Sequence, residues 1–264
     1  MNNKQLTKAI IPLAGLGTRM YPFTNSIPKS FIPIVKDNQF KPIFQILVEE
    51  LLEAGIKKIA LVINKSQKKF YSDFFTKLNN DIEKHIKYYY QEKQLGLGDA
   101  ILCAKDFIRD EPFMLVLGDQ IYKSFDSRSC TKQLIDTYNR INNNIISVMK
   151  EELKNIEKYG VFIGEKPQNR VYKITKILEK PSIEEAKKYN NKGDYYIAFG
   201  EYILDKEIIK KLEEYKNNNP DKEIPFTEFL DEVYDELYCY IENGIMYDVG
   251  NINSYLNTIK ELYQ

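Results

Sequence analysis

Residues 8–14 read Lys-Ala-Ile-Ile-Pro-Leu-Ala, residues 15–19 read Gly-Leu-Gly-Thr-Arg, and this continuous stretch decides the fold. Its apolar part is typical of a strand that is buried on both faces of a sheet. Its two glycines let backbone N–H groups approach an anion, and the guanidinium of Arg19 can bind two phosphate oxygens. The loop lacks the Gly-Lys-Ser/Thr of a Walker loop and the third glycine of a dinucleotide fingerprint. By itself it indicates either a phosphate-binding turn of another kind or an ordinary tight turn.

The first half of the chain continues as alternating strands and helices. Pro42 suits the first turn of a helix, and Gly55 suits the end of one. The alternation predicts an α/β, Rossmann-like fold in which a mostly parallel mixed sheet is flanked by helices. The expected strands are 58–63, 86–90 and 113–117, and the expected helices are 42–54, 68–78 and 97–107.

The second half has short strands without long helices between them. A chain of 264 residues that is 43% hydrophobic can bury one large core. We therefore expect a single domain, residues 1–264, with one half at about 8–125 and a second half at about 126–264 that completes the sheet. The expected strands are 145–150, 160–163, 171–179, 195–204 and 237–242, and the expected helices are 206–215, 224–234 and 252–262.

Composition excludes several classes of protein. Lys+Arg and Asp+Glu are both 38, so the net charge is zero and the chain lacks the basic footprint of a nucleic-acid binder. Its three cysteines, Cys103, Cys130 and Cys239, form no CxxC pair, which argues against zinc or a disulfide framework and favours reduced thiols. The apolar stretch 9–15 is too short to span a membrane and has no signal-peptide cleavage pattern. We expect a cytoplasmic protein with no membrane partner.

A second motif follows the glycine-rich loop. Residues 27–34 read Ile-Pro-Lys-Ser-Phe-Ile-Pro-Ile, so Lys29 lies on a segment that two prolines shape in advance. Its ammonium suits phosphate as a point charge, although a loop lysine taken alone indicates only an exposed surface. Leu13–Arg19, followed ten residues later by Lys29 and then by Pro33, resembles the signature of sugar-1-phosphate nucleotidyltransferases. The residues of these two motifs are most similar to those of the bacterial UTP–glucose-1-phosphate uridylyltransferases.

Further stretches match this family in the same order, so that the resemblance spans residues 8 to about 256. It implies the fold of nucleotide-diphospho-sugar transferases, with residues 8–125 as the nucleotide-binding half and residues 126–264 as the sugar-phosphate-binding half. The matching stretches are Gln91–Ala100, Leu117–Asp119, Tyr159–Val161, Glu179–Pro181 and Tyr247–Gly250.

The resemblance assigns the nucleotide to the first loop and to the segment that starts at Gln91. Base and ribose would lie over Ala14 and Gly15, and Gln91 and Gly96 would read the edge of the base, because an amide both donates and accepts hydrogen bonds. Arg19 and Lys29 would act in catalysis, by binding the triphosphate and offsetting charge as pyrophosphate departs. The full implied nucleotide-binding set is Ala14, Gly15, Gly17, Thr18, Gln91 and Gly96.

The resemblance also implies a metal and a second substrate. Asp119, at the carboxyl end of a strand, and Asp248 would hold Mg²⁺, although either aspartate could instead cap a turn. Glu179 would accept hydrogen bonds from the sugar hydroxyls and Lys180 would pair with the sugar's phosphate. Gly160 would let the backbone approach the sugar. Members of the family often form homodimers or homotetramers, so such an assembly is expected here.

These parts imply a reaction of the EC 2.7.7 class. A phosphate oxygen of the sugar 1-phosphate attacks the α-phosphorus of the nucleotide in line, and pyrophosphate leaves. A catalytically silent sensor on the same fold is one alternative, but such a relative is expected to have lost one of the charged residues named above. A glycosyltransferase that consumes a nucleotide sugar is another, but Asp119-Gln120-Ile121 does not supply the Asp-x-Asp motif of those enzymes.

The choice of substrate is less well defined than the reaction. The segment before Gln91 is short, and Gln120 follows Asp119, both of which resemble glucose-1-phosphate thymidylyltransferases. Asp99 stands where the uridylyl type often has histidine. UTP is therefore the first expected nucleotide, dTTP the second, and CTP stays open; glucose 1-phosphate is the sugar phosphate that the family implies.

Overall fold

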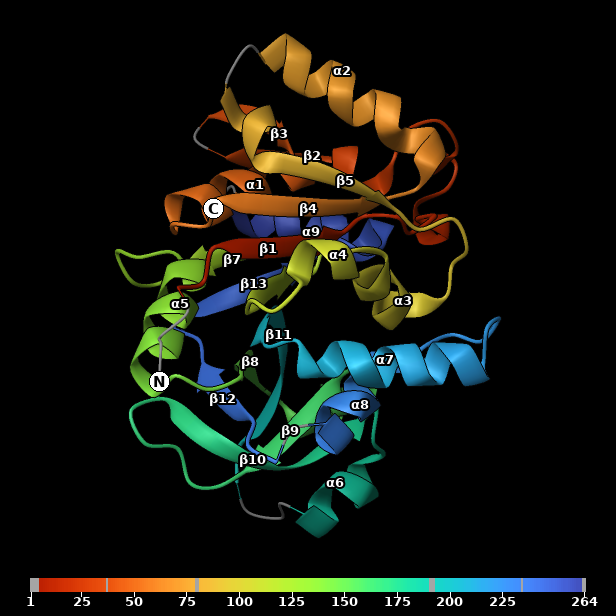
Figure 1. The fold of residues 1–264 in the computed structure, drawn as a ribbon. Helices are drawn as coiled ribbons and strands as arrows, with labels where there is room; N and C mark the ends of the chain where they lie inside the picture. Colours follow the sequence, from red (N-terminus) through yellow and green to blue (C-terminus); the bar gives the residue numbers. More distant parts are fainter. Residues whose placement is uncertain (1–4, 37, 79–80, 190–192, 234, 263–264) are drawn as a thin grey trace.

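The computed structural model describes residues 5–36, 38–78, 81–189, 193–233 and 235–262, and its centre is a nine-stranded sheet (Figure 1). The residues 1–4, and Tyr234 at the end of the expected helix 224–234, lie outside the described ranges. In sheet order the strands are β5 (Ile86–Tyr90), β4 (Lys58–Ile63), β1 (Lys8–Pro12), β6 (Phe113–Val116), β11 (Tyr195–Leu204), β8 (Ile145–Glu151), β12 (Tyr238–Ile241), β10 (Val171–Glu179) and β9 (Gly160–Gly164).

The sheet is parallel only in part. Neighbours from β5 to β6 are parallel, as expected for the first half, and so are β8 and β12. Strand β11 runs antiparallel to β6 and β8, and β10 runs antiparallel to β12 and β9. The expectation of a mostly parallel sheet is thus wrong for the second half, where a short connection such as 165–170, between β9 and β10, can join only antiparallel strands.

Strand β11 joins the two parts of the sheet. Besides β6 and β8 it pairs with β9 at Ile197↔Val161, so the strands β11, β8, β12, β10 and β9 close into a small ring. Its register shifts between Ala198 and Tyr202, around Gly200, whose φ is 108°. A Cβ atom at Gly200 would lie 1.5 Å from Oε1 of Gln120, so this bend requires glycine.

Two additional two-stranded sheets lie beside the main sheet. Strands β2 (Pro33–Lys36) and β3 (Gln39–Pro42) form one pair, and β7 (Gln120–Ser124) pairs with β13 (Gly244–Asp248) from the other end of the chain. None of the four was expected from the sequence. Each has only four or five residues, which is too few for an alternating pattern to stand out.

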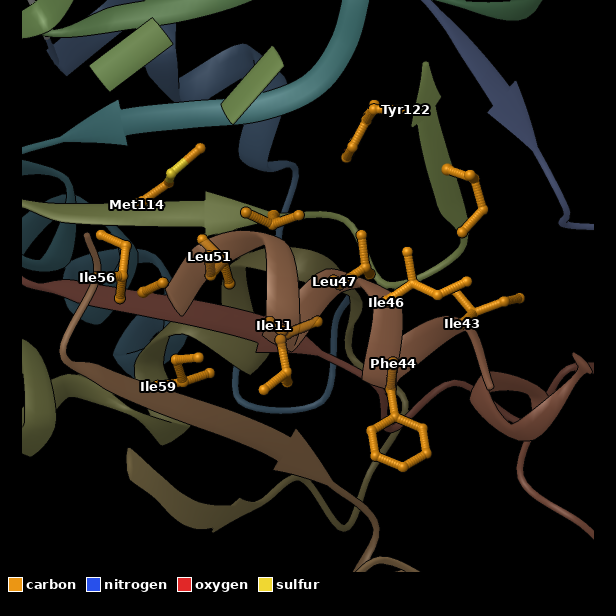
Figure 2. Packing of buried hydrophobic residues seen from close by; sticks show 14 of the residues in the cluster. Ile11, Ile43, Phe44, Ile46, Leu47, Leu51, Ile56, Ile59, Met114 and Tyr122 are labelled. Atoms are coloured by element: carbon orange, nitrogen blue, oxygen red, sulfur yellow. The ribbon is translucent and has the colours of Figure 1, made fainter. Parts of the chain in front are cut away.

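The helices cover both faces of the open part of the sheet. One face packs on α1, α2, α5 and α9, and the opposite face packs on α3, α4, α7 and α8. Figure 2 shows side chains of α1 over Ile11 and Ile59, which lie on β1 and β4. The bounds are α1 (Ile43–Glu53), α2 (Lys68–Leu78), α3 (Gly96–Cys103), α4 (Lys105–Ile108), α5 (Cys130–Ile141), α6 (Ile183–Tyr189), α7 (Glu207–Asn218), α8 (Phe226–Val233) and α9 (Ile252–Leu262).

The alternation of side chains along β1 explains the two cores. Ala9 and Ile11 point into the core under α1, whereas Ile10 points into the core under α3, and all three are fully buried. A strand that is buried on both faces reads as a continuous apolar run. The apolar stretch 8–14 therefore contains the buried strand that it predicts.

Three helical segments differ from expectation, and one of them, α6, was not predicted at all. The expected helix 97–107 is divided into α3 and α4 at Ala104, whose φ of −103° is not helical. Helix α5 was missed, although Ser129 caps it by accepting a hydrogen bond from the backbone N–H of Lys132, and Asn142 ends it in the left-handed conformation. A serine cap before an amphipathic run is a signal that could have found it.

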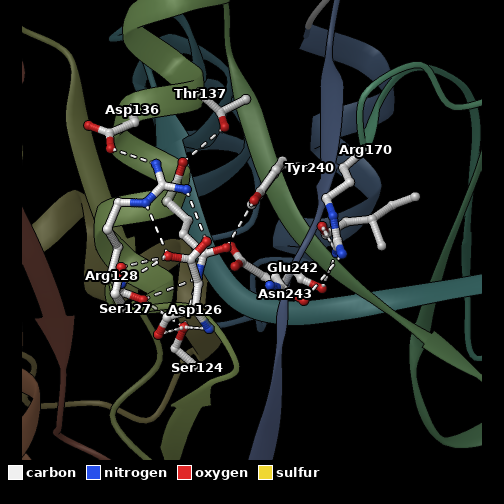
Figure 3. A network of polar contacts seen from close by, with 12 residues as sticks. Ser124, Asp126, Ser127, Arg128, Asp136, Thr137, Arg170, Tyr240, Glu242 and Asn243 are labelled. Carbon is white, nitrogen blue, oxygen red and sulfur yellow. Dashed lines mark hydrogen bonds and ion pairs between the residues drawn. The ribbon is translucent and has the colours of Figure 1, made fainter.

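Polar contacts fix the connection from β7 to α5 (Figure 3). Arg128 donates hydrogen bonds to Asp126 and Asp136, and the contact with the guanidinium lowers the pKa of Asp126 to about 2. Gln133 of α5 donates to Ser124 at the end of β7 and accepts from the hydroxyl of Tyr240 on β12. This network ties α5 to both β7 and β12.

Within the described residues, no helix is long and apolar enough to cross a membrane.

Candidate functional site

A pocket of about 290 Å³ lies at the carboxyl ends of β1 and β6. This is the edge at which open α/β sheets bind ligands. The residues expected to bind a nucleotide or its metal that line the pocket are Ala14, Gly15, Lys29, Gln91, Gly96 and Asp119. The structure thus brings together side chains from four separate stretches of the chain.

The glycine-rich loop adopts a conformation that only its glycines allow easily. Gly17 has a φ of 64°, and a Cβ atom there would lie 3.0 Å from the Cβ of Lys29 and 3.0 Å from Cγ2 of Thr24. The hydroxyl of Thr24 donates to the carbonyl of Gly17, which fixes the turn. Gly17 and Thr18 are not among the residues that line the pocket, so their expected contact with nucleotide stays a prediction.

Lys29 and Asp119 form an ion pair inside the pocket. The Nζ of Lys29 lies 2.8 Å from Oδ2 of Asp119, and the lysine side chain is only 14% exposed. Asp119 reaches this place because the chain after β6 crosses closely over the end of β1. A Cβ atom at Gly118 would lie 2.6 Å from the carbonyl oxygen of Pro12, so a larger residue would push the crossing away.

Asp248 lies beside Asp119 although 129 positions separate them, because β13 pairs with β7. Asp248 stands opposite Gln120 in that pair, and the N–H of Val249 donates to the carbonyl of Asp119 at 2.9 Å. A carboxylate oxygen of Asp248 accepts from the N–H of Gly250. A Cβ atom at Gly250 would also lie 3.3 Å from Nη2 of Arg19, so the guanidinium of Arg19 reaches the same turn.

This arrangement suits a magnesium ion that is bound together with a substrate. The described residues hold no group of three or more His, Cys, Asp or Glu side chains able to bind a metal by themselves. Mg²⁺ is usually bound by one or two carboxylates, with phosphate oxygens and water as its other ligands. Asp119 and Asp248 supply hard oxygen donors of that kind, next to cations that can hold phosphate.

Gln91 closes the other end of the pocket and is 4% exposed. Its Nε2 donates to the carbonyl of Gly96 at 3.0 Å and to Oδ2 of Asp99 at 2.9 Å. The other oxygen of Asp99 accepts from Nζ of Lys216, at the end of α7, at 2.6 Å. The expected pair of Gln91 and Gly96 is therefore in direct contact.

The segment around Gly96 is held from two sides. Gly96 has a φ of 82°, and a Cβ atom there would lie 2.6 Å from Cγ of Glu223. The side chain of Gln94 donates to the carbonyl of Ala14, which ties this segment to the first loop. Sequence reasoning missed the roles of Gln94 and Lys216. Gln94 lies inside a matching stretch and could have been considered, whereas nothing marks Lys216 among the many lysines.

The residues expected to bind the sugar phosphate lie on β9, on β10 and directly after β10. Gly160 stands opposite Glu179 in the strand pair, and a Cβ atom at Gly160 would lie 3.3 Å from Oε2 of Glu179. Lys180 has a φ of 46°, and its Nζ lies 3.0 Å from Oε1 of Glu179. Glu179 lines a second hollow of about 470 Å³, and Leu97 lines both this hollow and the first pocket.

Asp248 lies close enough to this second region to affect it electrostatically. The carbonyl of Tyr159 accepts from the N–H of Lys180 at 3.1 Å. Burial raises the pKa of Tyr159, and the charges of Glu151 and Asp248 raise it further. Asp248 therefore lies near the residues that are expected to bind the sugar phosphate.

Three carboxylates are buried behind β7 and are outside the motifs of the sequence analysis. Thr131 donates to Glu201 at 2.5 Å and to Glu50 at 3.3 Å, and both oxygens of Glu242 lack a hydrogen-bond partner among the described residues. Burial, and then the charge of Glu50, raises the pKa of Glu201 to about 8. Burial also raises the pKa of Glu242. We call Glu50, Glu201 and Glu242 the buried acid cluster.

Comparison with known proteins gives one consistent family. The family model described as nucleotidyl transferase matches residues 8–264. The UTP–glucose-1-phosphate uridylyltransferase YngB of Bacillus subtilis is 33% identical, over 94% of this chain and 86% of its own. A second Bacillus subtilis enzyme of that name is 31% identical, over 98% and 91%. The crystal structure of a UDP-glucose pyrophosphorylase complexed with UDP-glucose superimposes with a TM-score of 0.83 at 31% identity, over 98% of both chains.

Proposed function

The chain belongs to the nucleotidyl transferase family, and from that premise we propose that it joins UTP to glucose 1-phosphate, giving UDP-glucose and pyrophosphate. The main observation behind the proposal is the set of residues that line one pocket. Lys29 and Asp119 meet at 2.8 Å at one end, and the buried amide of Gln91 lies at the other. A charged triphosphate and a polar base need these two environments, one at each end of the nucleotide.

Arg19 and Lys29 bind the triphosphate in this proposal. Guanidinium and ammonium groups that face the departing pyrophosphate stabilise the charge that develops on it. Both cations are placed by rigid backbone, Arg19 by the turn at Gly17 and Lys29 by the segment between two prolines. They therefore need little rearrangement at the moment of reaction.

Asp119 and Asp248 hold Mg²⁺ in the proposal. A divalent cation at two carboxylates neutralises phosphate charge and orients the α-phosphate. The sugar phosphate needs no general base, because its attacking oxygen is already ionised near pH 7. The only histidine of the chain, His85, agrees with this, because it is partly exposed and its Nδ1 donates to the carbonyl of Lys57, away from the pocket.

Glu179 and Lys180 bind the sugar 1-phosphate in the proposal. The carboxylate of Glu179 accepts hydrogen bonds from sugar hydroxyls, and the ammonium of Lys180 pairs with the phosphate. The absence of a side chain at Gly160 leaves room for the ring beside Glu179. Both substrates are charged metabolites, so we place the reaction in the cytoplasm and propose residues 8–125 and 126–264 as its nucleotide and sugar-phosphate halves.

A turnover matrix tests the proposal. The purified chain is assayed for pyrophosphate release with UTP, dTTP, CTP, ATP and GTP, each against several sugar 1-phosphates, with and without Mg²⁺. We expect the highest kcat/KM for UTP with glucose 1-phosphate, and dTTP as the second nucleotide. Failure of every pair to release pyrophosphate would leave a silent binding protein as the better description.

A further inference from the structure

Both protons on the amide nitrogen of Gln91 are already in use. A primary amide has two N–H donors, and here one faces the carbonyl of Gly96 at 3.0 Å and the other faces a carboxylate oxygen of Asp99 at 2.9 Å. A backbone carbonyl and an ionised carboxylate can only accept. The two contacts together therefore fix which end of the amide points toward them.

The amide oxygen of Gln91 is left for a ligand. Within the described part of the chain no hydrogen bond reaches Oε1 of Gln91, and Oε1 is not among the buried atoms that lack a partner. Since Gln91 lines the pocket and is otherwise buried, this oxygen is exposed to the pocket. The pocket wall presents a hydrogen-bond acceptor there.

A carboxylate at position 99 satisfies both of its neighbours, whereas an asparagine cannot. Asp99 accepts from Gln91 with one oxygen and from Nζ of Lys216 with the other, at 2.6 Å. An asparagine has a single oxygen. It could satisfy Lys216 and turn its N–H₂ toward Gln91, or satisfy Gln91 and turn its N–H₂ toward an ammonium, and each choice places two donors face to face.

We propose that Asp99, held by Lys216, is a positioning residue that fixes the oxygen of Gln91 toward the pocket and so makes the site select pyrimidines whose N3 carries a proton. This proposal rests on the nucleotidyl transfer proposed above. Uracil and thymine carry a proton at N3 and donate to the amide oxygen, whereas N3 of cytosine is an acceptor and opposes it. An unmatched acceptor pair costs roughly tenfold to a hundredfold in kcat/KM.

The test is a double-mutant cycle with UTP, dTTP and CTP as substrates. In Asp99→Asn, we expect the ratio of kcat/KM for UTP to that for CTP to fall at least tenfold, because the amide of Gln91 can then turn its nitrogen to the pocket. In Lys216→Met, the carboxylate of Asp99 still accepts from Gln91, so the ratio should change less than threefold. In the double variant, no ammonium opposes an asparagine that turns its oxygen to Gln91, so the ratio should return toward that of the unchanged chain.

Two internal controls distinguish a loss of the positioning of Gln91 from general damage to the folded enzyme. The ratio of UTP to dTTP should stay constant in every variant, because both bases present the same N3–H. Lys210→Met makes the same change on the same helix, at an exposed lysine paired with Glu207, and should alter no ratio. Asp99→Ala removes one of the two acceptors and should lower the UTP to CTP ratio less than Asp99→Asn does.

Specific outcomes would overturn the proposal. Unchanged selectivity in both Asp99→Asn and Asp99→Ala would do so, and so would a loss in Asp99→Asn that Lys216→Met does not rescue. If the unchanged chain turns over no nucleotide, the proposed function fails separately. The same ratios are then measured as Kd values for UTP and CTP by calorimetry, and equal ratios across the variants would still reject the positioning role.

Discussion

The ion pair of Lys29 and Asp119 places opposite charges at the point where metal and triphosphate would meet. When substrate binds, Asp119 can bind a cation and Lys29 can bind phosphate, so each side chain has a second partner besides the other. The roles of individual residues can therefore be separated by changing one charge at a time and measuring each substrate independently.

Asp119→Asn should lower kcat on the order of 100-fold, because the neutral amide holds a divalent cation poorly at the place where charge develops. Pyrophosphate release at saturating Mg²⁺ measures this. Asp73→Asn, at an exposed aspartate of α2 paired with Lys69, is the matched control and should leave kcat unchanged. A near-normal rate for Asp119→Asn at saturating Mg²⁺ would remove Asp119 from the metal role.

Lys180→Met should raise KM for glucose 1-phosphate about tenfold and leave KM for UTP nearly unchanged, since a phosphate contact to a lysine contributes about 1–3 kcal/mol. Steady-state kinetics with each substrate varied in turn measures the difference. Lys176→Met is the matched control: Lys176 lies on β10, four residues before Lys180, and pairs with Asp231, so this variant should change neither KM. Equal increases in both KM values would argue against a specific contact with the sugar phosphate.

At the scale of elements, the bend of β11 at Gly200 brings together the open sheet and the ring of strands. Its position is coupled to the site, because Gln120 packs against Gly200 and is next to Asp119 in sequence. The carbonyl of Gly200 also accepts from the N–H of Leu117. A change at this one glycine should therefore affect both stability and the position of Asp119, the proposed metal ligand.

Gly200→Ala should lower the free energy of unfolding by more than about 2 kcal/mol, because it combines a left-handed backbone with a steric clash. Gly55→Ala is the matched comparison: its φ is 105°, but a Cβ atom there has no neighbour within 4 Å. It should cost only about 1 kcal/mol. Urea unfolding of both variants measures the difference, and similar losses would show that the contact with Gln120 does not matter.

The elements that local sequence pattern could predict are the long apolar or amphipathic ones. Strand β1 and helix α1 have patterns that no neighbour is needed to explain, and they lie within a residue or two of their expected bounds. Strands β7 and β13 were missed because their pairing joins residues more than 100 positions apart. Short strands gain stability from such a partner, and one sequence does not reveal which segment that partner is.

In the candidate site, too, the residues that lie in local motifs were predicted and those that depend on distant contacts were missed. Lys29 and Gln91 were predicted because they lie in spaced motifs, and both line the pocket. Lys216 was not predicted because it comes from the last turn of α7 and contacts the site only through Asp99. A residue that acts through another leaves no local pattern, and its role became apparent only from the hydrogen bonds.

At the scale of the whole molecule, the buried acid cluster makes stability depend on pH. The folded chain raises the pKa of Glu201 from 4.5 to about 8, so the folded state holds a proton that the unfolded state loses. Between these values the folded state binds more protons, and stability therefore falls as pH rises from about 4.5 to about 8. The same direction holds for Glu50 and Glu242, whose pKa values burial also raises.

Glu201→Gln should reduce the loss of folding stability at high pH. The amide is neutral at every pH and keeps an oxygen that can accept from Thr131. We expect the variant to be more stable than the unchanged chain at pH 8, on the order of a few kcal/mol, with the difference shrinking toward pH 5. Urea unfolding at several pH values measures it. Glu213→Gln, at an exposed pair with Lys105, is the control. Parallel pH curves for Glu201→Gln and the unchanged chain would contradict the assignment.

The pairing of β7 with β13 has a consequence for how such genes can recombine. Among the strand pairings of the described residues, a chimera that joins residues 1–125 of this chain to the remainder of a relative would have to re-form two between its parents, β6 with β11 and β7 with β13. Both depend largely on backbone hydrogen bonds, which tolerate differences in sequence. Asp119 would come from one parent and Asp248 from the other. Crossovers near residue 125 would thus test whether the two carboxylates evolved as a matched pair.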